Sequence, residues 1–220
     1  GSFPHELPGY RHISNPETRA IYENIWGVKI KEKPGMRIPN MLDAAIAGEY
    51  KGIYIQGEDI AQSDPNTQHV TAGLSAMEMV IVQDLFLNET AKYAHVFLPG
   101  TSFLEKDGTF TNAERRINRV RPTMPSKTGK DEWEVTCDLA KAMGYNMHYD
   151  NAAQIMDEIA ATTPTFAGVS FARLDAEGSM QWPVNDNAPD GTPIMHIEKF
   201  VRGSGNFMLT PYVATEEKTN

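Results

Sequence analysis

The sequence predicts an α/β fold built on a doubly wound, mostly parallel sheet, of which the chain holds one half. Three short apolar segments, at residues 52–56, 79–82 and 95–98, have the length and β-branched content of buried strands. Between them lie two segments with helix-capping residues. Strand, helix, strand, helix, strand at this spacing requires crossover connections, so we expect parallel strands in a Rossmann-like half with irregular flanking segments.

Helices are predicted before and between these strands from their caps. A helix is expected from Asn15-Pro16 to residue 26, and a second one from Asn40, its N-cap, to Gly48. Ser63 or Asp64 is expected to cap a third helix, with Pro65 in its first turn. Asn88 is expected to cap a short fourth one.

The rest of the chain divides around this α/β unit. Residues 1–39 are expected to be an irregular lead-in with one short helix, and residues 40–163 the α/β domain. Within it, residues 101–123 make an excursion towards a neighbouring domain, with a turn at 105–109 and an irregular basic segment at 112–121. Helices follow at 131–144 and 151–161. Residues 164–220 are rich in Gly, Pro and Asn and are expected to be mostly loop with a few short strands.

Composition excludes several classes of function. The net charge of -9 argues against a nucleic-acid surface, which needs clustered Lys and Arg. No apolar run approaches the length of a membrane span and no leader is recognised, so we expect a cytoplasmic protein without a membrane contact. The single cysteine, Cys137, excludes an internal disulfide and is expected in the core. No histidine spacing suggests a metal site.

Polar or small residues follow all three predicted strands. They are Gly57-Glu58-Asp59, Gln83-Asp84 and the run from Pro99 to Ser102. Because the carboxyl ends of parallel strands share one edge, where open α/β folds bind their ligands, these residues should converge on one site.

The chemistry of these residues suits a nucleobase better than a phosphate. Carboxylates and amides accept hydrogen bonds from ring N–H groups, and one carboxylate can accept both the N1–H and the amine of guanine. Phosphates would instead lie at helix N-termini near Ser63 or Asp64 and Asn88. Neither GxGxxG nor GxxxxGK followed by Ser or Thr is present.

Structural interpretations of the same residues stay open. Gly57 could simply end a strand, Asp59 could cap a turn, and Gln83-Asp84 could be a solvated strand end. The basic residues between Arg115 and Arg121 could form a solvated face, or could pack on an anionic cofactor or a partner domain.

Six sets of residues along the chain are typical of one family: YIQGED (54–59), VQDLFLNETA (82–91), FLPG (97–100), EKDGTFTNAERR (105–116), FP (3–4) with LPGY (7–10), and QWP (181–183). In these segments the chain resembles the molybdopterin oxidoreductases, and within them the catalytic subunit of NAD-dependent formate dehydrogenases. The resemblance covers essentially all 220 residues. It implies that residues 40–163 are the domain that binds a dinucleotide cofactor.

The resemblance implies a role for each strand-end residue. Asp59 matches the carboxylate that reads the guanine of one molybdopterin guanine dinucleotide, and Ser63 matches a neighbouring hydroxyl contact. Gln83 and Asp84 match a second pair around the same nucleotide.

Four further positions complete this implied site, and one of them, Glu132, differs from the family's usual residue. Gly57 and Glu58 belong to the guanine-binding motif, and the glycine allows close approach of the dinucleotide. Gly100 matches a small residue at the cofactor. Glu132 stands where many relatives have aspartate, which puts its contact in question.

The resemblance also implies what the complete enzyme contains. Its cofactors are two molybdopterin guanine dinucleotides with Mo or W, and 4Fe-4S clusters elsewhere. Its partners are the remaining domains of the same subunit, and flavin and iron-sulfur subunits that pass electrons from formate to NAD. No catalytic residue and no metal ligand of the family matches a position in this chain, so we expect an internal portion of the subunit that is inactive alone.

Three other functions stay open on sequence grounds. One is a different molybdopterin oxidoreductase, such as a nitrate reductase, because the cofactor motifs are shared more widely than the substrate pocket. The second is a non-catalytic homologue that keeps the fold without the cofactor. The third is an independent purine-nucleotide-binding module.

Overall fold

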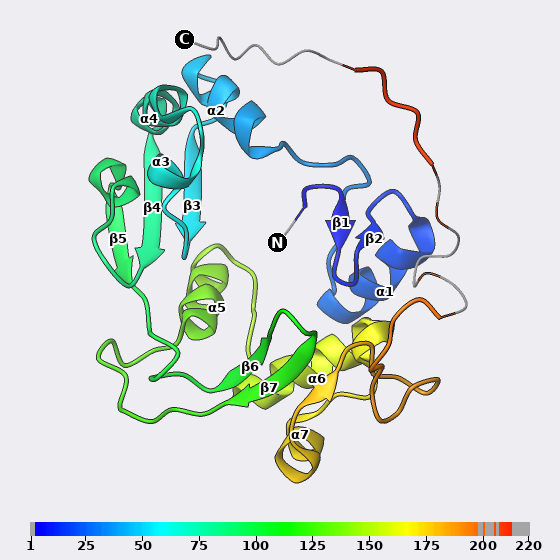
Figure 1. Ribbon diagram of the computed structural model, residues 1–220. Coiled ribbons are helices and arrows are strands. Elements are labelled where there is room, and N and C mark those ends of the chain that lie inside the picture. Colours follow the sequence, from blue (N-terminus) through cyan, green and yellow to red (C-terminus); the bar gives the residue numbers. More distant parts are fainter. Residues whose placement is uncertain (1–2, 198–199, 201–204, 206, 213–220) are drawn as a thin grey trace, which may run out of the picture.

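The predicted parallel sheet is present in the computed structural model, which describes residues 3–197, 200, 205 and 207–212. Its strands are β3 (Gly52–Gln56), β4 (Met79–Asp84) and β5 (Val96–Pro99), in the order β3-β4-β5. Both neighbouring pairs are parallel, and the three arrows run the same way in Figure 1. The predicted α/β class is therefore confirmed.

Helices pack against this sheet around a single apolar core. They are α2 (Ile38–Ile46), α3 (Ile60–Ser63), α4 (Thr67–Ala76) and the short 3-10 helix η1 (Thr90–Tyr93). The core is formed by aliphatic side chains from helices and strands, namely Leu42, Ala45, Ile55, Ile60, Val70, Leu74, Met77, Val80 and Val82.

Two predicted helix starts in this region were wrong. α2 begins at Ile38, with Pro39 in its first turn, so Asn40 lies inside the helix rather than at its cap. Ser63 ends α3, and the side chain of Asn66 caps α4 by accepting from the backbone N–H of His69. Asn66 thus takes the place of the predicted caps, Ser63 and Asp64.

A second, antiparallel sheet stands where irregular chain was expected. It consists of β6 (Gly108–Thr111), β7 (Arg116–Val120) and β8 (Met180–Gln181), in the order β6-β7-β8. α6 (Ala152–Thr162), η2 (Pro164–Phe166) and α7 (Phe171–Glu177) accompany it. Its core contains Ile117, Met156, Val169, Leu174, Met180 and Val184. The sequence did not predict α7, whose cap is Ser170.

Helix α5 (Glu132–Ala142) begins beside the segment that follows β5, where Glu132 accepts from the N–H of Thr101. Asp131 caps it in a capping box with Glu134, at the predicted start. Burial, and then the charge of Glu134, raises the pKa of the Asp131 carboxyl. Cys137 is 4% exposed in this helix, as expected for a core residue.

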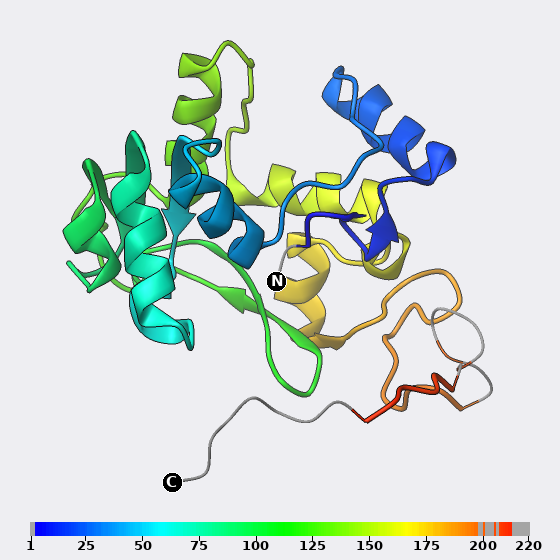
Figure 2. The same cartoon turned by 90° about the horizontal axis from the view of Figure 1, so that it is seen from above.

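The N-terminal hairpin is attached to the end of α6. It consists of β1 (Glu6–Leu7) and β2 (Arg11–His12) and is followed by α1 (Pro16–Trp26), which has the predicted cap Asn15. The guanidinium of Arg11 donates to the carbonyl of Thr162 and to the hydroxyl of Tyr22. Figure 2 shows the hairpin and α1 beside α6, on the opposite side from the parallel sheet.

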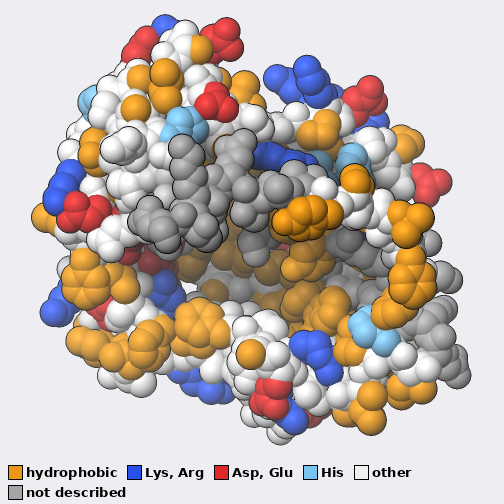
Figure 3. Space-filling model, turned by 45° about the horizontal axis from the view of Figure 1, so that its top comes forward, with side chains coloured by type: hydrophobic (Ala, Val, Ile, Leu, Met, Phe, Trp, Pro, Cys, Tyr) orange, Lys and Arg blue, Asp and Glu red, His pale blue; other side chains and the backbone are white. Residues whose placement is uncertain are grey.

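The molecule has no candidate membrane span in the part that the structure describes, because none of those helices is both long and apolar enough. Exposed apolar side chains are nevertheless frequent. In Figure 3 they line the hollow of one face and gather along its rim.

Candidate functional site

The three parallel strands bring their polar ends together at one edge, as predicted. Gln56 pairs with Gln83 in the sheet, and Asp84 pairs with Pro99. Beyond the strands, the N–H of Gly57 donates to the carbonyl of Gln83 at 2.9 Å, and the N–H of Gly100 donates to that of Asp84 at 2.9 Å. Four predicted site residues thus lie on neighbouring chain segments.

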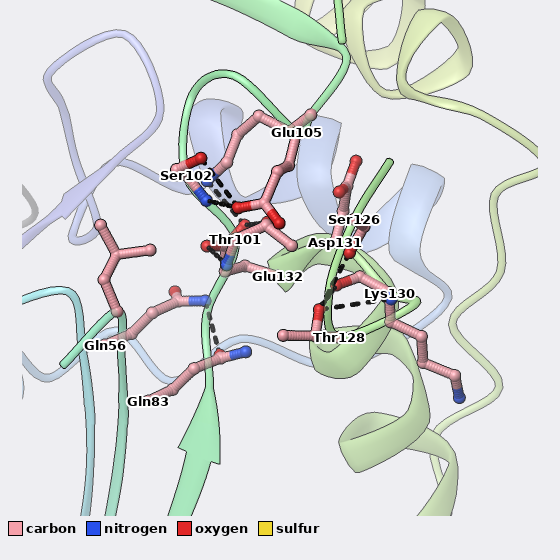
Figure 4. A network of polar contacts seen from close by, with 12 residues as sticks. Gln56, Gln83, Thr101, Ser102, Glu105, Ser126, Thr128, Lys130, Asp131 and Glu132 are labelled. Carbon is pink, nitrogen blue, oxygen red and sulfur yellow. Dashed lines mark hydrogen bonds and ion pairs between the residues drawn. The ribbon is translucent and has the colours of Figure 1, made fainter. Parts of the chain in front are cut away.

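Gln83 is a deeply buried polar residue of this edge. It is 1% exposed, and its Oε1 accepts from the Tyr54 hydroxyl and from Gln56 Nε2, the latter at 3.1 Å (Figure 4). Its Nε2 has no hydrogen-bond partner among the described residues. A buried N–H group without a partner costs about 1–3 kcal/mol, so an acceptor atom placed here by a ligand would remove a real penalty.

Asp84 organises the loop that follows β4. Its Oδ1 accepts from the N–H of Leu85 at 2.6 Å, and its Oδ2 accepts from Asn88 Nδ2 at 2.9 Å. Asn88 in turn accepts from the N–H of Ala91 at 2.9 Å in the first turn of η1, although the residue at the N-cap position is Glu89 rather than the predicted Asn88. The loop presents Phe86, 77% exposed, and Leu87, 78% exposed, to the outside.

Asp59 connects the end of β3 to η1. Its Oδ1 accepts from the N–H of Thr90 at 2.9 Å and from the Thr90 hydroxyl at 2.6 Å, while Oδ2 accepts from the N–H of Glu89 at 3.3 Å. Burial raises the pKa of Asp59, but the hydrogen bonds from Thr90 and Glu89 outweigh it, and the net pKa is lowered. A carboxylate has about four acceptor positions, so Oδ2 keeps one for a further donor.

The other residues of the predicted guanine motif lie on the surface. Gly57 has a left-handed φ of +64°, and no other atom lies within 4 Å of the place of a side chain, so its conformation rather than lack of space favours glycine. Glu58 is exposed. Ser63 is also exposed, at the C-terminal end of α3, where it belongs to no helix N-terminus.

Glu132 ties α5 to the segment that follows β5. Its Oε1 accepts from the N–H of Thr101 at 2.9 Å, and its Oε2 accepts from the Thr101 hydroxyl at 2.8 Å and from Lys106 Nζ at 2.7 Å. Burial raises the pKa of Glu132, but these donors, led by Lys106, lower it more. A Cβ on Gly100 would lie 3.2 Å from Glu132 Oε1 and 3.3 Å from the backbone of Asp84. Gly100 therefore permits this close packing.

A second carboxylate fixes the same segment from the other side. Glu105 Oε2 accepts from the N–H and the hydroxyl of Ser102 at 2.9 and 2.8 Å, and Oε1 accepts from the N–H of Lys127 at 2.8 Å (Figure 4). These hydrogen bonds, that from Lys127 first, lower the pKa of Glu105 to about 2. Segments 101–106 and 126–132 are thereby held beside the sheet edge.

Two residues of this edge, Thr90 and Lys106, were not predicted from the sequence, whereas Thr101 lies in the predicted run from Pro99 to Ser102. Thr90 and Thr101 are 0% and 2% exposed and bind the carboxylates of Asp59 and Glu132. Lys106 pairs with Glu132. A buried threonine next to a capping residue, as in Asn88-Glu89-Thr90, is the one signal that could have suggested such a role.

Two arginines of the basic segment, Arg115 and Arg119, bind groups within the chain. Arg115 donates to the carbonyls of Trp182, Thr192 and Pro193. Arg119 pairs with Asp107 at 2.8 Å and with Asp175 at 3.1 Å, and lies 3.7 Å from the centre of the Phe171 ring. The guanidinium groups of these two residues are therefore held by acceptors within the chain.

Metal ligation has no structural support in the described part of the chain. Within it, no group of three or more His, Cys, Asp or Glu side chains is close enough to hold an ion. What the edge offers is hydrogen-bonding capacity at Gln83 and Asp59, with backbone accessible at Gly57.

Fold and site together define a class of α/β protein whose ligand site lies at the carboxyl edge of a parallel sheet. Residues 8–142 match the sequence model of the molybdopterin oxidoreductase family, and the chain belongs to that family. The family implies a molybdopterin cofactor. The unpartnered Gln83 amide fits a group rich in acceptor atoms.

Similar proteins are consistent with this assignment. The chain is 38% identical over 219 residues to a "Probable oxidoreductase" of Bacillus subtilis, and 40% identical over 214 residues to a "Putative formate dehydrogenase" of Staphylococcus haemolyticus. These matches cover 99% and 96% of the chain but 22% and 21% of the relatives, so the chain spans about a fifth of their length.

A solved structure supports the fold. Acetylene hydratase from Pelobacter acetylenicus superimposes with a TM-score of 0.56 at 20% identity, over 80% of this chain and 26% of that protein.

Proposed function

We propose that this chain is the molybdopterin guanine dinucleotide-binding portion of a formate dehydrogenase catalytic subunit. Family membership and the name of the Staphylococcus relative support the proposal. The structural observation that carries it is the Gln83 amide, which is buried at the sheet edge with an unpartnered Nε2.

The residues of the edge would bind and orient the cofactor. Gln83 Nε2 would donate to an acceptor of the base, and Oδ2 of Asp59 would accept one of its N–H groups. Gly57 would let the nucleotide approach the backbone. When bound, the cofactor supplies the metal-centred redox chemistry, and this chain supplies its position.

The complete enzyme would extend beyond this chain. We infer that formate is oxidised to CO2 in the cytoplasm, and that flavin and iron-sulfur subunits pass the electrons to NAD. Molybdenum or tungsten would be held by two dinucleotides, with 4Fe-4S clusters in other parts of the subunit. Glu58, Ser63, Asp84, Gly100 and Glu132 would shape the nucleotide site, mostly through the segments that they hold.

Calorimetry of the 220-residue chain with GDP tests the proposal. ADP, which differs from GDP in its base, is the comparison ligand. We expect GDP to bind more tightly than ADP, and Gln83→Met to weaken GDP binding at least tenfold. Gln68→Met, at an exposed position of α4, is the control and should bind as the wild type does. Unfolding curves would verify that both variants fold.

Two outcomes would contradict the proposal. One is GDP affinity that Gln83→Met leaves unchanged in a folded chain. The other is formate-dependent dye reduction by the chain alone, because that would require a catalytic centre within these residues.

A further inference from the structure

Three residues with unusual backbone conformations line two adjoining pockets that share no residue with the sheet edge. Among the described non-glycine residues, Tyr10, Arg115 and His196 have a left-handed φ, at 57°, 68° and 62°. Tyr10 and Arg115 line a pocket with Trp182, and an adjoining pocket shares Tyr10 and Trp182 and reaches His196. Such conformations cost about 1–3 kcal/mol each and concentrate at functional sites.

The walls of this pocket are mainly aromatic. Its volume is about 320 Å³, and Tyr10, Phe166 and Trp182 supply its rings. The rings of Phe166 and Trp182 are 6.5 Å apart and inclined at 50°. The threonines Thr111 and Thr165 add hydroxyl-bearing side chains, and the volume suits one small ligand.

Both sides of the pocket are fixed by arginines that bind backbone carbonyls. Arg115 donates to the carbonyls of Trp182, Thr192 and Pro193, and its own carbonyl accepts from the N–H of Trp182 at 2.9 Å. Opposite, Arg11 holds the hairpin that carries Tyr10 against Thr162. The walls are therefore in place before any ligand arrives, which lowers the entropic cost of binding.

The hairpin turn that carries Tyr10 packs closely against the residue that follows α6. A Cβ at Gly9 would lie 3.0 Å from Cγ2 of Thr163, so the turn sits directly on the end of α6. The ring of Tyr10 follows on the next residue and is 54% exposed. The turn thus presents an aromatic ring from a rigid support.

Charge decides which aromatic ligand fits. Arg115 is the one charged side chain among the described residues that line the pocket, and it is positive. A cation would gain from the ring faces but would be repelled by Arg115. A neutral planar ring joined to an anionic group gains from both: the ring stacks on aromatic side chains, which contributes about 1–3 kcal/mol per base, and the anion is attracted by Arg115.

We propose that this pocket is a second ligand site, which binds a planar heteroaromatic ring joined to an anionic group, as in a nucleotide. It shares no residue with the sheet edge. The proposal is therefore independent of the function proposed for that edge.

Titration of the 220-residue chain with FMN, followed by flavin fluorescence, tests this site. We expect saturable quenching, with riboflavin binding more weakly than FMN because it lacks the phosphate. Tyr10→Gly removes the ring and suits a left-handed φ, and should weaken FMN binding at least tenfold. Phe166→Leu should weaken it less, and Phe103→Ala, at an exposed ring outside the pocket, should leave it unchanged.

Other results would overturn the proposal. FMN binding that is not saturable, or that Tyr10→Gly leaves unchanged in a folded chain, would remove the site. Displacement of FMN by choline, or equal affinity for riboflavin and FMN, would show that the pocket does not select negative charge. Circular dichroism of each variant provides the test of folding.

Discussion

The two sheets of the molecule are stabilised in different ways. The parallel sheet contributes Val80 and Val82, both 0% exposed, to a core that α2, α3 and α4 complete. In the antiparallel sheet, β7 contributes one buried side chain, Ile117, and its Arg119 reaches two carboxylates and a ring. Apolar burial dominates the first sheet, and charged contacts over long sequence distances assist the second.

This difference explains why one sheet is visible in the sequence and the other is not. A strand buried on both faces is a continuous apolar run, which is recognisable from one segment alone. A strand whose arginine side chains are satisfied by distant acceptors looks like a solvated basic segment until the partners are known. The two modes of stabilisation can be separated by mutation.

The largest effect is expected in the apolar core. Leu74→Ala on α4 removes a side chain that is 1% exposed, and should lower the free energy of unfolding by about 3 kcal/mol through lost burial and a cavity. Urea denaturation measures it. Ile46→Ala, at a position 51% exposed on α2, should cost less than about 1 kcal/mol. Equal losses would mean that burial in this core is not what stabilises the parallel sheet.

An intermediate effect is expected at Arg119. Its side chain is 9% exposed, so Arg119→Ala would leave Asp107 without this partner and Asp175 with Arg121 alone, and should cost about 2 kcal/mol. Arg119→Lys should recover little, because an ammonium cannot bridge both carboxylates and stack on Phe171.

Arg121→Ala is the matched control for Arg119. Its side chain is 57% exposed and pairs with the same Asp175, and we expect a change below about 0.5 kcal/mol in the urea experiment. A loss as large as that of Arg119→Ala would show that the antiparallel sheet depends on surface charge rather than on one enclosed guanidinium.

The smallest effect is expected at Glu132, which joins α5 to the end of the parallel sheet. Its pKa in the folded chain is lowered, so its stabilising contribution is complete above the pKa of the unfolded chain and is lost as pH falls through the folded value. Between about pH 5 and pH 3, wild type should lose on the order of 1 kcal/mol more than Glu132→Gln.

Thermal unfolding across that pH range measures the difference. Glu49→Gln, at an exposed carboxylate, should keep the acid sensitivity of wild type. If Glu132→Gln were as sensitive to acid as wild type, the carboxylate would not be the group that couples α5 to the sheet edge.

The location of the candidate site was predictable, and its internal contacts were not. Gly57, Gln83 and Gly100 lie where apolar runs end, and strand ends in a parallel sheet meet at one edge. The partners of Asp59 and Glu132 are 31 residues away, at Thr90 and Thr101. No local pattern indicates which distant hydroxyl a carboxylate will accept from.

The same reason accounts for the errors in the secondary structure. Local caps correctly predicted the starts of α1, α5 and α6. Ser63 and Asp64 were the predicted caps of the next helix, but the structure caps α4 with Asn66. β8 is two residues long and exists because β7 is beside it.

The reactivity of Cys137 can report on the movement of helix α5. It is the single thiol of the sequence, 4% exposed in α5, and burial raises its pKa. The protonated, enclosed sulfur reacts with a maleimide only while α5 is displaced. The labelling rate therefore measures how often α5 moves far enough to expose this sulfur.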